Sequence, residues 1–190
     1  MPYGVKDLSY FKETCVSSES IFDGKVLHVR FDQITLPNGQ PATREYIRHV
    51  GAVCVLPLTE EGDVICVRQY RYATGEVILE IPAGKLDYKE ENPDDAVRRE
   101  LREETGAVCS RLTPLGWFYS SPALMDERIH MYLAEGLTFG ETDPDEDEFV
   151  ESVRIPLSAL VDMVMRGEIT DIKTQAAVMR VEYLLRHREK

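Results

Sequence analysis

Apolar and polar side chains alternate along residues 25–36, a pattern typical of a strand in a half-buried sheet. This run ends just before Asn38-Gly39, a pair that favours a tight hairpin turn. Neighbouring runs of the same kind complete an antiparallel segment, whose predicted strands span residues 18–22, 25–36 and 42–47. Three strands form only a thin core. We therefore expect this segment to need a partner, which is either the rest of the chain or a second copy.

Longer apolar runs follow, and they alternate with helical patterns. Residues 51–58 are almost continuously apolar, as expected for a strand buried on both faces. The further predicted strands span residues 64–70, 77–81, 112–119, 128–134 and 149–155, and the predicted helices span 93–105, 157–166 and 171–186. Strands interspersed with helices predict an α/β or α+β fold. We divide the chain into an N-terminal antiparallel β segment, residues 1–48, and a second domain, residues 49–190.

The helix predicted at residues 93–105 has clear signals at both ends. Asn92 can cap the free N–H groups of the first turn, and Pro93 suits the first helical position. Gly106 favours the left-handed conformation in which helices often end. The apolar residues that can seat this helix on a core are Ala96, Val97 and Leu101.

The same helix carries Glu100, Glu103 and Glu104, whose spacing places them on one face. Two interpretations are open: a solvated acidic face, which is ordinary for glutamate, or a site where a divalent cation offsets the mutual repulsion. Carboxylate oxygens suit Mg²⁺ or Mn²⁺. The sequence context favours the metal site, because a sharp break at Ala83-Gly84 precedes the helix. Glycine lets the backbone approach another group closely, and the Ala83 carbonyl is a further candidate oxygen ligand.

These residues resemble the signature of the Nudix hydrolases. That signature is a Gly, five residues, a Glu, seven residues, and then Arg-Glu-apolar-x-Glu-Glu-x-Gly-apolar, which is long enough to be specific. Gly84 matches its first position, and residues 99–107 match every fixed position of its second half. One residue is inserted between the two halves. Counting from Gly84 the signature Glu falls on Glu90, and counting back from Arg99 it falls on Glu91, so both remain candidates.

The resemblance implies the Nudix fold, a mixed β-sheet sandwiched between helices, and hydrolysis of a diphosphate bond with Mg²⁺ (Mn²⁺ possible). The ADP-sugar pyrophosphatase subfamily, ADP-ribose pyrophosphatase above all, is the nearest match. Its members have an N-terminal strand segment and a proline about fifteen residues past the signature, as Pro122 stands fifteen residues after Ala107 here. The expected products are AMP and a sugar phosphate. Two alternatives stay open: a Nudix hydrolase for a GDP-sugar, dinucleotide or damaged nucleotide, or a non-catalytic ADP-ribose-sensing module, which the intact glutamates disfavour.

The resemblance also implies a set of site residues. The expected metal ligands are the carbonyl of Ala83 and the side chains of Glu100, Glu103, Glu104 and Glu148. The expected catalytic residues are Glu103, Glu146 and Arg99. The expected substrate-binding residues are Arg44, Glu45, Arg71, Lys85, Pro122 and Glu127. Glu146 and Glu148 belong to an acidic loop, and their roles as base and ligand could be exchanged.

Individual roles follow from the chemistry of each side chain. Arg99 is expected to orient the helix carboxylates by charge-assisted hydrogen bonds rather than to touch substrate. Arg71, at the end of a predicted strand, is expected to pair with a phosphate. Arg44 and Glu45 match an N-terminal position that reaches the nucleotide in the subfamily, often across a dimer, and the resemblance implies the same role here. Glu127 is expected to bind ribose hydroxyls. An ordinary surface charge or cross-strand pair remains the alternative for these four residues.

Composition narrows the class of protein further. The net charge is −12, from 22 basic and 34 acidic residues, which argues against a broad nucleic-acid-binding surface. The four cysteines lack metal-site spacing, and Cys54 and Cys66 lie in apolar strands where we expect buried thiols. With neither a signal peptide nor a long apolar run, we expect a cytoplasmic protein. The thin N-terminal sheet leads us to expect a homodimer that acts on a nucleoside diphosphate sugar.

Overall fold

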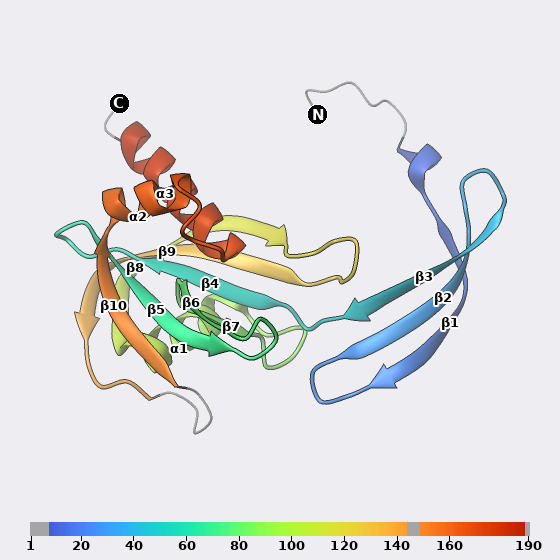
Figure 1. Cartoon of the computed structure of the whole chain (residues 1–190), viewed down its shortest axis with the longest axis horizontal. Helices are drawn as coiled ribbons and strands as arrows, with labels where there is room; N and C mark the ends of the chain where they lie inside the picture. Colours follow the sequence, from blue (N-terminus) through green and yellow to red (C-terminus); the bar gives the residue numbers. More distant parts are fainter. Residues whose placement is uncertain (1–7, 144–148, 189–190) are drawn as a thin grey trace. The chain divides into compact units, whose positions relative to one another are not determined.

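The protein forms two compact units in a computed structural model that describes residues 8–143 and 149–188. The N-terminal unit comprises Met1–His49 with the loop Ser121–Glu127, and the C-terminal unit comprises Val50–Ser120 with Arg128–Lys190 (Figure 1). The sequence had placed that loop with residues 49–190. The loop lies in the N-terminal unit because its backbone pairs with Ile47, which accepts from the N–H of Asp126 and donates to the carbonyl of Leu124.

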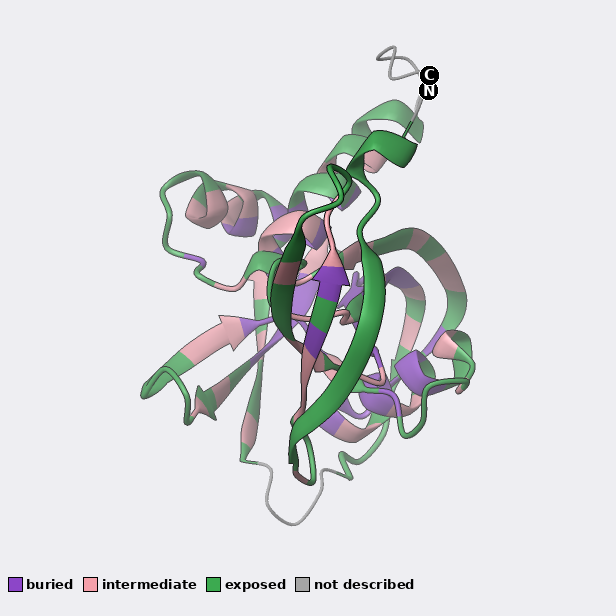
Figure 2. Cartoon of the chain, turned by 90° about the vertical axis from the view of Figure 1, so that its right-hand side faces the viewer, coloured by how far each residue is buried: buried purple, intermediate pink, exposed green. Residues whose placement is uncertain are grey.

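The N-terminal unit is a three-stranded antiparallel sheet in the order β1-β2-β3, as predicted. Its elements are a short 3₁₀ helix η1 (Ser9–Phe11), β1 (Thr14–Asp23), β2 (His28–Thr35) and β3 (Pro41–Arg48). β2 begins at His28 rather than Lys25, because the N–H of Gly24 donates to the carbonyl of Leu27 and closes a turn over those residues. All ten residues of β1 are exposed, as Figure 2 shows, whereas Asp32 and Ile34 of β2 are buried.

The C-terminal unit contains two sheets, of strand order β10-β5-β6 and β7-β4-β9-β8. The strands are β4 (Ala52–Pro57), β5 (Asp63–Arg71), β6 (Glu76–Glu80), β7 (Ala83–Lys85), β8 (Ala107–Tyr119), β9 (Arg128–Phe139) and β10 (Val150–Pro156). The helices are α1 (Pro93–Thr105), α2 (Leu157–Met165) and α3 (Ile172–Arg188). β4 and β9 are parallel and the other pairs antiparallel, so the predicted mixed sheet is confirmed.

The central strand β4 is buried on both faces, which explains its unbroken apolar sequence. Cys54 and Leu56 pack in a core with α2 and α3, whereas Val53 and Val55 pack in a second core with α1. Figure 1 shows α2 and α3 over one face of the sheet and α1 on the other. This layered arrangement is the one predicted. The buried thiols expected at Cys54 and Cys66 are also confirmed, and burial raises the pKa of each to about 12.

In the C-terminal unit, the larger differences from the sequence prediction concern β7, β8 and β9. Residues 83–85, predicted as a break, form the short strand β7, which pairs with the start of β4. β8 begins at Ala107 rather than Leu112, and β9 continues to Phe139 rather than Ala134, because these ends pair with each other in one long antiparallel ribbon. Polar residues on that ribbon mask its pattern in the sequence. Among the described residues, no helix has the length and apolar character needed to span a membrane.

Candidate active site

Helix α1 has the predicted bounds, and its ends are fixed by local interactions. The side chain of Asn92 accepts a hydrogen bond from the N–H of Asp94 at 3.1 Å. Gly106 has φ of 68°, and its N–H donates to the carbonyl of Arg102 at 2.8 Å. A left-handed residue ends a helix in this way at little cost only when it is glycine. The residues that seat the helix on the sheet are Ala96, Val97 and Leu101, which are 0%, 0% and 1% exposed.

The glutamates of α1 do not form a solvated face. Glu100 and Glu104 are only 9% and 4% exposed, whereas the Glu103 side chain keeps 23% of its surface. Burying a carboxylate is costly unless it is hydrogen-bonded or paired with a cation. The interpretation of these residues as an ordinary acidic surface is therefore wrong for Glu100 and Glu104.

Arg99 supplies positive charge to this group. Its Nη1 donates to Glu100 Oε1 at 2.8 Å and to Glu103 Oε2 at 3.3 Å. Its Nη2 lies 3.6 Å from carboxylate oxygens of both Asp87 and Glu91. Burial works to lower the pKa of Arg99, but the charges of Glu100 and Asp87 outweigh it and raise that pKa. One guanidinium thus draws together carboxylates that would otherwise repel each other.

The segment before the helix meets two of these glutamates. The N–H of Ala83 donates to Glu104 Oε2 at 3.1 Å. A Cβ atom on Gly84 would lie 2.0 Å from Glu100 Cδ, so only glycine leaves room for that carboxylate. The close approach that Gly84 permits is therefore an approach to Glu100. β7 itself is held in register by pairing with β4, where Ala83 faces Cys54.

The inserted residue between Gly84 and Arg99 leaves two glutamates in different surroundings. Glu91 accepts a hydrogen bond from the N–H of Asp87 at 2.6 Å, keeps 11% of its side-chain surface, and faces Arg99. Glu90 is exposed. Of the two candidates, Glu91 is therefore the one that contacts the rest of the signature.

A buried ionic cluster beside the signature was not anticipated from the sequence. Glu80, 2% exposed, accepts two hydrogen bonds of 2.7 Å from Arg71 and a further one from Lys173. Burial works to raise the pKa of Glu80, but the bonds and charges of Arg71 and Lys173 outweigh it and lower that pKa. The predicted phosphate partner Arg71 is therefore engaged with Glu80. The only sign of this cluster in the sequence is Glu80 itself, a single acidic residue at the end of an apolar strand.

The remaining predicted residues have separate surroundings. In the N-terminal unit, Arg44 is ion-paired with Glu13, and a Glu127 oxygen lies 3.4 Å from His49 Nδ1. Glu45 and Pro122 of that unit are exposed, as is Lys85 at the end of β7 in the C-terminal unit. Glu146 and Glu148 lie outside the described residues.

The donor set of the C-terminal unit fits a divalent cation chemically. Three carboxylates from successive turns and a backbone carbonyl are hard oxygen donors, and Gly84 leaves the space beside Glu100 that a Cβ would fill. Within residues 8–143 and 149–188, no group of three or more His, Cys, Asp or Glu side chains already converges as a metal cluster. The carboxylates are instead engaged by Arg99 and by the Ala83 N–H.

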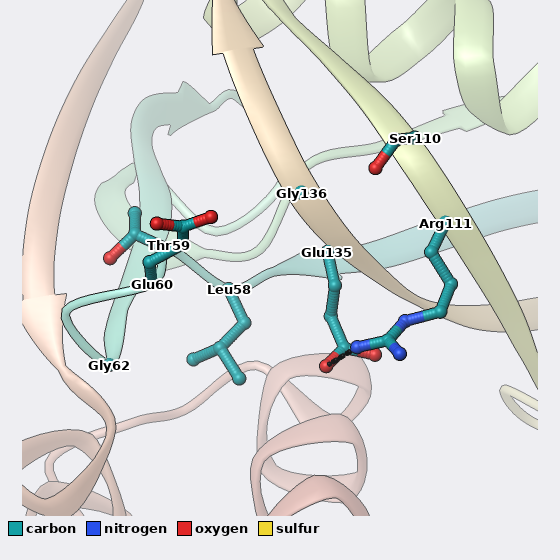
Figure 3. A pocket seen from close by; sticks show the side chains of 8 residues that line it. All are labelled: Leu58, Thr59, Glu60, Gly62, Ser110, Arg111, Glu135 and Gly136. Atoms are coloured by element: carbon teal, nitrogen blue, oxygen red, sulfur yellow. Dashed lines mark hydrogen bonds and ion pairs between the residues drawn. The ribbon is translucent and has the colours of Figure 1, made fainter.

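A surface pocket of about 560 Å³ lies elsewhere in the C-terminal unit (Figure 3). It is lined by Leu58, Thr59, Glu60, Gly62, Ser110, Arg111, Glu135 and Gly136. The side chains of Arg111 and Glu135 point toward one another in Figure 3. The Arg111 guanidinium donates to Glu135 at 2.7 Å, and Arg188 binds the same carboxylate at 2.9 Å. The residues that line the pocket come from the β4–β5 turn, β8 and β9 rather than from α1, so this pocket is separate from the signature.

Comparison of the sequence with known protein families identifies the family of this chain. The NUDIX domain matches residues 47–175, and the nucleoside diphosphate sugar hydrolase N-terminal domain matches residues 13–47. The chain belongs to the Nudix hydrolase family. The Nudix signature anticipated from the sequence, and the Nudix fold it implied, are thereby confirmed. Members of this family typically depend on a divalent metal ion.

Similar proteins are known across most of the chain's length. An "ADP-ribose pyrophosphatase" of Bacillus subtilis is 42% identical over 173 residues, covering 90% of this chain and 93% of its own. A "Methanol dehydrogenase activator" of Bacillus methanolicus is 41% identical over 182 residues, covering 94% and 98%. A crystal structure of an ADP compounds hydrolase superposes with a TM-score of 0.82 at 23% identity, covering 93% of this chain and 96% of that one. The Nudix pyrophosphatase class is therefore shown, together with its fold.

Proposed function

We propose that this Nudix hydrolase cleaves the diphosphate bond of ADP-ribose or a related ADP-sugar, giving AMP and a sugar phosphate, with Mg²⁺ as its metal. The observation that carries the proposal is the pair of buried glutamates on α1, Glu100 and Glu104, held against Ala83-Gly84. The match of residues 13–47 to the N-terminal domain of nucleoside diphosphate sugar hydrolases supports the substrate class. The name of the Bacillus subtilis relative supports ADP-ribose in particular.

The proposed metal ligands are Glu100, Glu103, Glu104 and the Ala83 carbonyl. When bound, the cation would neutralise charge on the diphosphate and acidify a water molecule. Arg99 holds Glu100 and Glu103 close together against their repulsion, so less reorganisation is needed to bind a cation. We assign the first Glu position of the signature to Glu91, since its carboxylate faces Arg99. The acidic loop completes the proposal with Glu148 as ligand and Glu146 as base, or with these two roles exchanged.

Substrate contacts are proposed in both units. In the C-terminal unit, Arg71 is in electrostatic reach of Glu104, so a phosphate beside that carboxylate would meet its guanidinium, and exposed Lys85 adds positive charge. In the N-terminal unit we propose Arg44 and Glu45 on β3, and Pro122 and Glu127 in the Ser121–Glu127 loop. Arg44 would have to exchange its ion pair with Glu13 for the ligand.

The proposed assembly is a homodimer formed through the N-terminal sheet. Val16, Ile21 and Phe22 of β1 are 66%, 59% and 55% exposed. Apolar side chains gathered on one small sheet favour burial against another surface. Light scattering is expected to give twice the chain mass of 21.7 kDa, and a clean monomer would contradict the dimer.

A substrate panel tests the function directly. The protein is incubated with Mg²⁺ and ADP-ribose, an ADP-hexose, GDP-mannose, a dinucleoside polyphosphate or an oxidised nucleoside triphosphate, and nucleotide release is measured. We expect the highest kcat/KM with ADP-ribose or the ADP-hexose. Preference for GDP-mannose would overturn the ADP-sugar assignment. Lack of turnover with every compound would support a sensing module, or an activator role like the one named for the Bacillus methanolicus relative.

Replacing one proposed ligand tests the metal assignment. Glu104→Gln keeps the size of the side chain but removes its charge, and we expect kcat to fall at least about 100-fold. Glu76→Gln, at an exposed position at the start of β6, is the matched control and should leave kcat unchanged. Retained turnover in Glu104→Gln would remove the assignment.

A further inference from the structure

The segment that leads into the Nudix signature, residues 80–83, is hydrogen-bonded to the first turn of α3. Two consecutive residues, Glu80 at the end of β6 and Ile81 directly after it, contact two consecutive residues of that turn, Lys173 and Thr174. Lys173 Nζ binds the Glu80 carboxylate, and the N–H of Ile81 donates to Thr174 Oγ1 at 2.8 Å. All four side chains are shielded from solvent, since Ile81 and Thr174 are 1% exposed or less and Lys173 keeps 12% of its side-chain surface.

The first turn of α3 is itself fixed by hydrogen bonds to Asp171. Asp171 accepts from the N–H of Thr174 at 2.9 Å and from its hydroxyl at 2.5 Å, a capping arrangement at the helix start. Asp171 also pairs with Lys173 at 2.9 Å. The acidic partners Glu80 and Asp171 balance the basic partners Arg71 and Lys173, so this cluster adds no net charge to its surroundings. Because the members are bonded to one another and all but Arg71 are largely shielded from solvent, a shift of one would break bonds of the others.

The segment bonded to α3 at Glu80 and Ile81 continues directly to Ala83. The carbonyl of Pro82 accepts from the N–H of Val55 at 3.0 Å, and the N–H of Ala83 donates to Glu104. The backbone from Glu80 to Ala83 is therefore held from one side by α3 and from the other by α1. Ala83 cannot move relative to Glu104 without breaking one of these contacts.

We propose that Lys173 and Thr174 are positioning residues of the Nudix site: through Glu80 and Ile81 they set the place of Ala83-Gly84 against Glu100 and Glu104. They touch neither the proposed metal nor the substrate. The inference rests on the proposed function, because it takes Ala83, Glu100 and Glu104 as the metal site. Partners that orient ligands in this indirect way change metal affinity or activity by about 10- to 100-fold when removed.

The competing explanation is that the cluster only stabilises α3. Substitution of Lys173 would lower stability under both explanations, so stability alone does not separate them. Metal affinity does, because a purely stabilising contact should leave the affinity of the folded protein unchanged. Val181→Ala provides the matched control, since Val181 is 0% exposed on the same helix and packs in the core formed with α2.

The test measures Mn²⁺ affinity by calorimetric titration of the nucleotide-free, full-length protein at a temperature where every variant is folded. We expect Lys173→Met and Thr174→Val each to weaken binding about tenfold. Lys173→Arg and Thr174→Ser, which retain the cation and the hydroxyl, should remain within about threefold of wild type. Val181→Ala should lower Tm but leave the affinity within twofold. Wild-type affinity in Lys173→Met, or an equal loss in Val181→Ala, would overturn the proposal.

Two further arms make the result decisive. Glu104→Gln is titrated beside the other variants: if its affinity equals that of wild type, the metal site itself is misassigned and the proposed function fails. If Glu104→Gln loses affinity and Lys173→Met does not, only the positioning role fails. Should Lys173→Met not fold, Thr174→Val decides alone, because valine matches threonine in shape and removes only the hydroxyl, which accepts from Ile81 and donates to Asp171.

Discussion

The strands β1 and β4 are both paired along their length, yet their surroundings are opposite. All ten residues of β1 are exposed, whereas all six residues of β4 are buried. In the N-terminal unit, order comes from backbone pairing and tight turns. In the C-terminal unit it comes from two apolar cores on either face of one sheet. The proposed metal ligands stand on the second kind of scaffold, which can hold side chains within the narrow tolerance that a catalytic site needs.

The largest effect that follows from this contrast concerns the N-terminal sheet in isolation. A peptide of residues 8–49 is expected to show no cooperative unfolding transition by circular dichroism. Its described residues bury a single aliphatic side chain, Ile34, and three strands without a core are marginal in water. A sharp transition at micromolar concentration would show that backbone pairing alone suffices. If the transition appears only at high concentration, association supplies the missing core.

Truncation of one apolar side chain in each unit compares the two directly. Leu101→Ala, at a position 1% exposed under α1, should lower the free energy of unfolding by about 2–5 kcal/mol. Val16→Ala, at a position 66% exposed in β1, should change it by less than about 0.5 kcal/mol in the monomer. Urea denaturation at low protein concentration measures both. A large loss in Val16→Ala under those conditions would mean that β1 packs against a surface in the folded chain.

Acid sensitivity offers a finer comparison, between Glu80 of the C-terminal unit and Asp32 of β2. At Glu80, burial raises the pKa but Arg71 and Lys173 outweigh it, so the pKa lies below its ordinary value of 4.5. Such a group stabilises the fold above pH 4.5, and that contribution is lost as the pH falls further. Glu80→Gln should therefore cost about 3 kcal/mol at pH 7, and the difference from wild type should shrink below pH 4.5.

Asp32 serves as the comparison residue because its pKa is lowered too, chiefly by hydrogen bonds from Ser18 and then Tyr46. Asp32→Asn should show the same sign of pH dependence and a smaller amplitude, since the surrounding sheet is largely open to solvent. Denaturation between pH 3 and pH 7 compares the two variants. Equal amplitudes would argue that the N-terminal sheet is as well shielded as the C-terminal core.

Thiol reactivity gives the smallest signal. Cys15 is exposed in β1, whereas Cys54, Cys66 and Cys109 are buried. A disulfide reagent at pH 8 should therefore modify one thiol per native chain and all four in denaturant. Desolvation and the charge of Asp32 raise the pKa of Cys15, so its reaction should accelerate as the pH rises above 8. Rapid modification of Cys54 would reveal opening of the central sheet.

The sequence predicted those elements whose signals are local. The bounds of α1 follow from Asn92, Pro93 and Gly106, all adjacent to the helix, and the hairpin at Asn38-Gly39 closes β2 onto β3 as expected. The Nudix signature located the glutamates in the same way. In each case the information that fixes the structure lies within a few residues of it.

Long-range contacts account for what the sequence missed. β7 forms only because residues 83–85 pair with β4, some thirty residues earlier. The ion pair between Glu80 and Lys173 joins residues 93 positions apart. The Ser121–Glu127 loop joins the N-terminal unit through backbone bonds to Ile47. Such pairings depend on how separate elements pack, which the pattern around each residue does not record.

Gly84 has a consequence for how this protein tolerates mutation. Its backbone is not in the left-handed region, so any residue could adopt its conformation, but a methyl group there would overlap Glu100. Gly84→Ala would therefore leave the backbone conformation unstrained but would displace the Glu100 carboxylate. Substitutions at position 84 would lower activity while the fold persisted. A library sorted only for soluble, folded protein would therefore retain variants that a library sorted for turnover discards.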